Sequence, residues 1–178
     1  MKKLTLVLAA GAAFAATPVM AQDTDSGGLF VGATAGYDTI NLEAAGTDED
    51  DSGVFYGLVV GYDVDAGAAT IGLEAEVSDT SISDEVGETG LDIYGGVRLG
   101  YEMDANDVIY IKAGYTNVDV DLTDNLEGVR VGGGFEHNFG GFVGRLEYRY
   151  SNYNVSDVLM ADINGNRHQI GVTLGARF

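Results

Sequence analysis

The stretch Gly141-Phe-Val-Gly-Arg-Leu-Glu-Tyr-Arg-Tyr150 alternates apolar and charged side chains. On a β-strand, successive side chains point to opposite faces of the sheet. One face of this strand therefore carries Leu146 and Tyr148, and the other carries Arg145 and Glu147. A charged face of this kind favours a barrel that is turned inside out, with apolar groups facing lipid and charged groups paired in the lumen.

The same alternation recurs along the whole chain. Apolar residues occupy every second position in eight segments, which we expect to be strands. The segments are about 28–39, 54–63, 69–78, 91–101, 109–116, 129–136, 141–150 and 168–178. Strands of roughly ten residues suit a tilted crossing of a bilayer. The connections alternate between short turns (64–68, 102–106 and 138–140) and long loops (40–53, 79–90, 117–127 and 151–166). We therefore predict an all-β fold, an eight-stranded antiparallel up-and-down transmembrane β-barrel.

The N-terminus is typical of a secretory signal peptide. Two lysines precede an apolar run, 4–16, and small residues lead up to Ala21. The run is too short to span a bilayer as a helix, which argues against the alternative of a retained anchor. We expect cleavage after residue 21, which leaves one barrel domain over 22–178.

The composition excludes several classes of protein. The mature chain keeps seven of the nine basic residues and all 28 acidic ones, so its formal charge is −21. No nucleic-acid partner is expected, because no basic patch could neutralise phosphates. The chain has no Cys, so it contains no disulfide and no thiol nucleophile or ligand. Twenty-seven Gly residues and a single Pro disfavour both helices and disorder.

The basic residues test the inside-out interpretation. When the apolar residues alone set the faces, all seven mature basic residues fall on the opposite face, which chance would produce about once in a hundred. A basic residue facing lipid near the midplane would cost about 2–4 kcal/mol. We therefore predict a lumen ion-pair network of Glu74, Glu76, Asp92, Arg98, Lys112, Arg130, Glu136, Arg145, Glu147, Arg149 and Arg177.

Large inward aromatic residues should help to fill the lumen. An eight-stranded barrel is just wide enough for its own side chains. Phe30, Phe55, Tyr94 and Tyr110 all lie on the inward face of the expected strands. Together with the ion pairs they should plug the barrel, so we expect no general diffusion pore.

Outward aromatic residues gather near the two ends of the expected strands. Such girdles mark the two interfaces between membrane and water. The predicted interface residues are Tyr37, Tyr115, Tyr148 and Tyr150 at the outer rim, and Tyr62, Tyr101, Phe135, Phe142 and Phe178 at the periplasmic rim. The alternative is a set of ordinary strand aromatics in the core of a soluble protein.

Several short motifs resemble those of known barrels. They are Arg145-Leu-Glu-Tyr-Arg-Tyr150, the pairs Gly36-Tyr37, Gly61-Tyr62, Gly100-Tyr101 and Gly114-Tyr115, and the ending Gly175-Ala-Arg-Phe178. In these the chain resembles the small outer-membrane β-barrel family that includes the OmpA transmembrane domain, the opacity-type proteins and the Omp25-like proteins. The resemblance implies a place in the cell outer membrane, contact with outer-membrane lipid and lipopolysaccharide, and recognition of the last strand by the outer-membrane assembly machinery. Ala176 stands where such proteins often have an aromatic residue.

No catalytic constellation emerges from the sequence. The lipid A deacylase among small outer-membrane barrels has a His-x-Ser-Asn motif, but the nearest stretch here is Arg149-Tyr-Ser151-Asn152. An Arg cannot act as a general base at neutral pH. His137 and His168 are the only histidines, and no group has the spacing of metal ligands. We expect no enzymatic activity, no cofactor and no catalytic metal, and we expect His168 to face outward at a rim.

Acidic runs mark the expected loops. Asp48–Asp51, Asp84-Glu85, Asp119 and Asp121 could bind Ca²⁺ or Mg²⁺ weakly and so bridge to lipopolysaccharide phosphates. The alternative is a solvated, self-repelling surface.

Three functions remain open. The first is a structural or surface-interaction barrel, the second a narrow porin for small solutes, and the third a soluble exported barrel that binds a hydrophobic ligand.

Overall fold

The structure is a computed structural model of the chain, and it describes residues 27–44, 47–81, 83–84, 87–120, 126–155 and 163–178. The expected signal peptide, 1–21, lies outside these residues. The strands are β1 Gly28–Ala44, β2 Thr47–Asp65, β3 Ala69–Thr80, β4 Ser83–Asp84, β5 Gly87–Glu102, β6 Asp107–Val120, β7 Leu126–Asn138, β8 Val143–Val155 and β9 Ile163–Arg177. No helix within the described part of the chain is long and apolar enough to cross a membrane.

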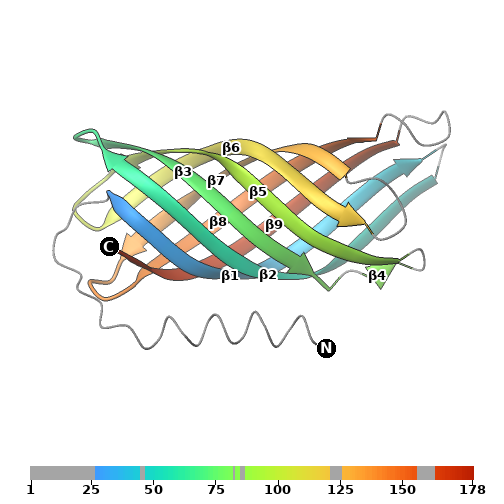
Figure 1. Cartoon of the computed structure of the whole chain (residues 1–178), viewed down its shortest axis with the longest axis horizontal. Coiled ribbons are helices and arrows are strands. Elements are labelled where there is room, and N and C mark those ends of the chain that lie inside the picture. Colours follow the sequence, from blue (N-terminus) through green and yellow to red (C-terminus); the bar gives the residue numbers. More distant parts are fainter. Residues whose placement is uncertain (1–26, 45–46, 82, 85–86, 121–125, 156–162) are drawn as a thin grey trace.

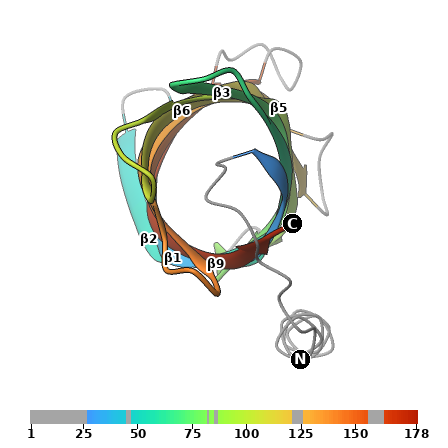
Figure 2. The same ribbon diagram turned by 90° about the vertical axis from the view of Figure 1, so that its left-hand side faces the viewer.

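Eight long strands close into a barrel (Figure 1). Each pairs antiparallel with its neighbours, β3 pairs directly with β5, and the two-residue β4 pairs only with β5. Strand β9 returns to β1, with Tyr37 opposite Ile170 and Gly32 opposite Gly175. Figure 2 looks along the barrel and shows the strands as a closed ring. The eight-stranded antiparallel barrel predicted from the sequence is thus confirmed. Closure pairs each long strand on both sides within the barrel wall, whereas residues 47–54 of β2 extend beyond the β2–β3 ladder and pair in the described ladders with β1.

The polarity of the barrel wall is reversed relative to a soluble protein. Leu73 and Ile111 point outward and are 67% and 63% exposed. Arg130 and Arg149 point inward and are 0% and 1% exposed. Because side chains alternate along each strand, one register places every apolar stripe outside and every charged stripe inside.

The strands extend further than the sequence predicted. The stretch 40–53 was expected to be a loop, but β1 continues to Ala44 and β2 begins at Thr47, with Asn41 opposite Asp50 in the ladder. The expected loops 79–90, 117–127 and 151–166 are likewise shortened by strand at both ends. The boundaries were wrong because a hairpin that projects beyond the apolar band can be polar on both faces. Its backbone groups still pair across the ladder.

The two ends of the barrel differ in their connections. At one end, called here the terminal end, the chain enters at Gly28 and leaves at Phe178, and Leu29 and Phe178 exchange backbone hydrogen bonds of 2.8 Å. The connections at this end are the short segments 66–68, 103–106 and 139–142. Gly67 and Gly140 adopt positive φ angles of 88° and 83° there, which other residues rarely tolerate.

Candidate functional site

The lumen holds a cluster of fourteen charged side chains, which we call the lumen cluster. All but Arg177 are buried, and each makes at least one ion pair. The seven acidic members are Asp38, Asp63, Glu74, Glu76, Asp92, Glu136 and Glu147. The seven basic members are Arg98, Lys112, Arg130, Arg145, Arg149, Arg167 and Arg177. The formal charges of the cluster therefore cancel, which is the condition for burying so many ions.

Near the terminal end, one carboxylate binds three guanidinium groups. Glu136 accepts hydrogen bonds from Arg98 at 2.8 Å, Arg145 at 2.7 Å and Arg177 at 2.7 Å. Asp63 bridges two of the same arginines, at 2.5 Å from Arg98 and 3.0 Å from Arg177. Five side chains from five different strands are thereby tied together across the lumen.

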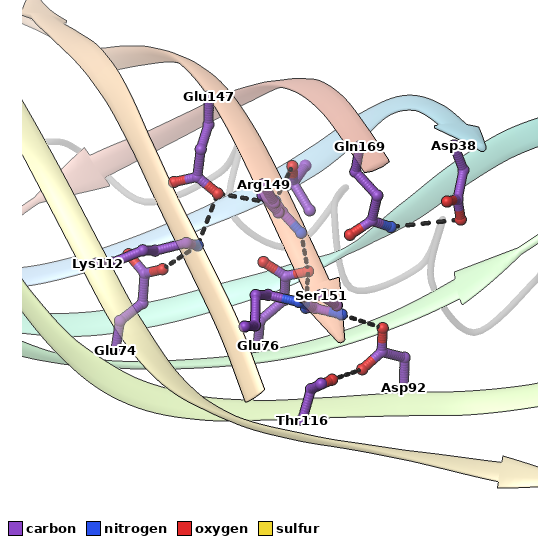
Figure 3. Close-up of polar contacts among 12 residues, drawn as sticks. Asp38, Glu74, Glu76, Asp92, Lys112, Thr116, Glu147, Arg149, Ser151 and Gln169 are labelled. Carbon is purple, nitrogen blue, oxygen red and sulfur yellow. Dashed lines mark hydrogen bonds and ion pairs between the residues drawn. The ribbon is translucent and has the colours of Figure 1, made fainter. Parts of the chain in front are cut away.

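In the middle of the barrel, acids and bases alternate along a chain of contacts (Figure 3). Lys112 lies between Glu74 at 2.7 Å and Glu147 at 2.6 Å. Arg149 continues the chain, with Glu147 at 2.6 Å and Glu76 at 2.5 Å. Lys112 on β6 contacts acids on β3 and β8, each two strands away, and Glu147 and Arg149 both lie on β8. Glu76 lies on β3, four strands from β8 around the ring, so the Arg149–Glu76 pair joins opposite walls of the barrel.

At the other end, Asp92 links two arginines. It accepts from Arg130 at 2.5 Å, from Arg167 at 2.8 Å and from the Thr116 hydroxyl at 2.5 Å. Arg167 also forms a two-nitrogen contact with Asp38. Fork-shaped guanidinium contacts of this kind fix orientation as well as charge.

Aromatic rings fill the space between the ions. The guanidinium carbon of Arg145 lies 3.6 Å from the ring centre of Phe30, and that of Arg98 lies 4.1 Å from the ring centre of Tyr110. Such cation–π contacts stabilise a cation that has lost its water. A Cβ at Gly134 would meet the Leu146 backbone oxygen at 2.5 Å and the Tyr110 hydroxyl at 2.7 Å, so the glycine leaves room for both the neighbouring strand and the ring.

A few buried polar atoms have no hydrogen-bond partner among the described residues. They include Glu76 Oε2, Arg130 Nη1, Ser78 Oγ and Gln169 Oε1. Arg130 Nη1 lies 3.9 Å from Glu76 Oε1, too far for a hydrogen bond. The network is therefore less completely satisfied around Glu76 than around Glu136.

The structure brings all eleven residues named for the lumen network into one cluster. Sequence reasoning left out three members, Asp38, Asp63 and Arg167. The two aspartates stand on the inward face of expected strands, so the alternation alone could have found them. Arg167 lies just outside the expected last strand, 168–178, and it was missed because β9 begins five residues before that strand, at Ile163.

The aromatic residues named for the two interfaces lie on the outer surface. Their exposure runs from 39% for Phe135 to 77% for Tyr115, and Tyr150 is half-buried. The acidic runs proposed for divalent cations lie outside the described residues or have no described side chains, apart from the exposed Asp51. Among the described residues, no group of three or more His, Asp or Glu side chains could hold a metal ion.

Each histidine makes one polar contact at its own end of the barrel. His137 Nδ1 lies 2.5 Å from Asp107 Oδ1 near the terminal end. His168 Nδ1 lies 2.7 Å from the Tyr148 hydroxyl near the opposite end. The two rings are therefore separated by the length of the barrel wall.

Comparisons with known proteins agree with this architecture. The family model described as "Outer membrane protein beta-barrel domain" matches residues 6–178. The crystal structure of neisserial surface protein A is similar, with a TM-score of 0.54 and 15% identity over 84% of this chain and 97% of that one. The attachment invasion locus protein Ail of Yersinia pestis gives a TM-score of 0.45 and 14% identity over 83% of this chain and 99% of that one. At 15% identity, the likeness to neisserial surface protein A concerns the fold alone. The comparison with curated proteins found no match.

Proposed function

Because the chain belongs to the family of outer-membrane β-barrel domains, we propose that it is a closed barrel with a structural and surface-interaction role and no enzymatic activity. The family match covers almost the whole chain, and the protein is an integral protein of the outer membrane. The short connections of the terminal end then face the periplasm and the opposite end faces the outside.

The observation that carries the proposal is the neutral, tightly filled lumen. Permeation would require an ion or solute to displace paired charges such as Lys112 between Glu74 and Glu147. Breaking a buried pair leaves an uncompensated charge and costs about 3–5 kcal/mol. Several such pairs lie one above another along the barrel, so a stable open pathway is disfavoured.

Conductance in planar bilayers tests this proposal. Purified protein refolded into a planar bilayer should give no large, long-lived current steps. The matched control is Leu146→Ala, which alters only the outward face of β8, where Leu146 is 53% exposed. Large stable steps from wild-type protein and from this control would overturn the closed-barrel function.

A narrow porin is the second candidate, and the unpaired atoms around Glu76 favour it. Glu76 Oε2, Ser78 Oγ and Arg130 Nη1 could exchange contacts with a small passing solute. Small current steps that change in Glu76→Gln, and not in Leu146→Ala, would support this candidate over the first.

The surface available for interaction is acidic. Every Lys and Arg from residue 27 onward belongs to the lumen cluster, so the aqueous surface carries acidic residues without basic ones. We propose that contact with lipopolysaccharide phosphates, where it occurs, uses Ca²⁺ or Mg²⁺ held weakly by the acidic connections. Calorimetry at millimolar Ca²⁺ and Mg²⁺ should detect uptake, and a flat titration would dismiss the cation bridge. We also propose that β9, which ends at Phe178, is the strand that the assembly machinery recognises.

A further inference from the structure

Five side chains form a polar and aromatic surface on the outside of β8 and β9, which we call the rim patch. Its members are Tyr148, Tyr150, Asn152, Asn166 and His168. The Tyr148 hydroxyl contacts His168 Nδ1 at 2.7 Å, and the Tyr150 hydroxyl donates to Asn166 Oδ1 at 2.7 Å. Asn152 Nδ2 donates to the same oxygen at 2.9 Å. The rings of Tyr150 and His168 lie 5.1 Å apart. The contacts hold the five groups as one unit.

The rim patch begins where the apolar wall ends. Leu146 and Val172 face each other in the ladder and are 53% and 52% exposed. The next three pairs of outward-facing residues along the ladder are Tyr148 with Ile170, Tyr150 with His168, and Asn152 with Asn166. Polarity thus rises over these three pairs, from aliphatic through aromatic to amide groups. Strands β8 and β9 lie side by side in Figure 1.

This gradient matches the passage from acyl chains to lipid headgroups. Tyrosine rings prefer that zone because one edge is apolar and the hydroxyl is polar. Given the proposed function, the rim patch lies at the end away from the termini and therefore in the outer leaflet. Its natural occupant is then a headgroup of that leaflet.

The chemistry of the rim patch selects among headgroups. It offers two phenol rings, one imidazole and two amides, and it contains no Lys or Arg. Anionic headgroups are normally held by Lys or Arg, and here all of these residues are committed to the lumen cluster. An uncharged sugar has hydroxyl groups that match amides and phenols, and an apolar C–H face that packs on a ring. We propose that the rim patch binds the uncharged sugar headgroup of an outer-leaflet glycolipid, an inference that rests on the proposed function.

The internal contacts leave donors and acceptors for a ligand. Asn166 Oδ1 already accepts from both Tyr150 and Asn152, which orients the amide and leaves its NH₂ group for an external acceptor. His168 uses Nδ1 toward Tyr148, which leaves Nε2 for a sugar hydroxyl. Groups that are already ordered lose little conformational entropy on binding.

A lipid competition experiment tests the rim patch. The barrel is refolded in a sugar-free detergent and offered monoglucosyl diacylglycerol and phosphatidylglycerol with identical acyl chains. Native mass spectrometry counts the lipids that stay bound. We expect the wild-type barrel to retain the glycolipid about tenfold more, the ratio that one or two hydrogen bonds supply. The double variant Tyr150→Phe/Asn166→Leu should lose this preference. The matched control Tyr115→Phe, on β6 and 77% exposed, should keep it.

Nuclear magnetic resonance on wild-type protein provides a second readout that needs no variant. The ring signals of His168 should move when the glycolipid is added, and those of His137 at the terminal end should not. Equal shifts of both rings, or no shift of His168, would overturn the assignment. Displacement of the glycolipid by the same concentration of methyl glucoside would overturn the commitment to a lipid ligand.

The experiment distinguishes an error in the proposed glycolipid site from an error in the proposed function of the barrel. Each sample is first checked for insertion by its altered migration on unheated detergent gels. A wild-type barrel that inserts and prefers neither lipid, or prefers the anionic one, contradicts only the glycolipid site. A wild-type chain that does not insert contradicts both.

Discussion

Replacing Arg149 by Met should destabilise the barrel strongly, because it leaves one carboxylate almost without a partner. Arg149 Nη1 lies 2.5 Å from Glu76 Oε1, whereas the next cation, at Arg130, lies 3.9 Å away and Glu76 Oε2 has no hydrogen bond. Glu147 is less affected, because it keeps Lys112 at 2.6 Å. Loss of one partner from a buried pair costs about 3–5 kcal/mol of unfolding free energy, and Met fills a similar volume without charge.

Two companion variants separate charge from packing. Adding Glu76→Gln to Arg149→Met removes the unpaired negative charge, so about half of the lost free energy of unfolding should be regained. The remaining loss is the cost of unpaired polar groups, about 1–3 kcal/mol. Arg145→Met should cost less than Arg149→Met. Its partner Glu136 keeps two arginines, and its partner Glu74 keeps Lys112 at 2.7 Å.

The assay is urea unfolding in lipid vesicles. Far-ultraviolet circular dichroism and the mobility of unheated protein on gels report the folded fraction, and linear extrapolation gives the free energy of unfolding. The surface control Glu127→Gln removes one exposed charge and should change the free energy of unfolding by less than about 0.5 kcal/mol. Equal stability of Arg149→Met and the control, or no recovery in the double variant, would refute the account of the lumen cluster.

Three further predictions concern the barrel wall and a turn. Gly134→Leu should lower refolding yield and stability by about 1–3 kcal/mol, because the new side chain meets the Tyr110 ring; Gly95→Ala, with nothing within 4 Å of the added carbon, should refold normally. Leu73→Arg should cost about 2–4 kcal/mol in vesicle unfolding, whereas Ala66→Arg in the aqueous turn should cost little. The backbone N–H group of residue 106, and then that of residue 107, lower the pKa of Asp104. This carboxylate therefore adds stability above its ordinary pKa near 4 and loses it as the pH falls through the lowered value. Wild type and Asp104→Ala should accordingly become equally stable in unfolding titrations at low pH, and a constant difference would contradict the assignment.

The sequence was sufficient to predict which face of each strand points toward lipid and which points into the lumen. In β8, for example, Arg145 and Arg149 could not face lipid, and Leu146 and Tyr148 had no reason to fill a charged lumen. Each strand repeats the test independently, so the period of two determines the register of the wall. The strand count followed from the same alternation.

The partners within the lumen could not be derived in that way. Lys112 contacts Glu74, 38 residues away, at a height set by the stagger between neighbouring strands. Alternation along one strand carries no information about that stagger. The strand ends were also missed, since polar residues such as Asn41 look the same in a loop and in a hairpin standing in water. The rim patch could not be predicted for a related reason, because its side chains come together only when β8 and β9 lie in register.

The reversed polarity of the wall is the central claim, and single tryptophans test it most directly, since the chain contains none. Leu146→Trp places the reporter outside the barrel, and Tyr94→Trp places it inside, where Tyr94 is 1% exposed. In vesicles made with lipids brominated on their acyl chains, we predict strong quenching of fluorescence for Leu146→Trp and little for Tyr94→Trp. Strong quenching of the fluorescence of Tyr94→Trp, together with no quenching for Leu146→Trp, would contradict the inside-out barrel.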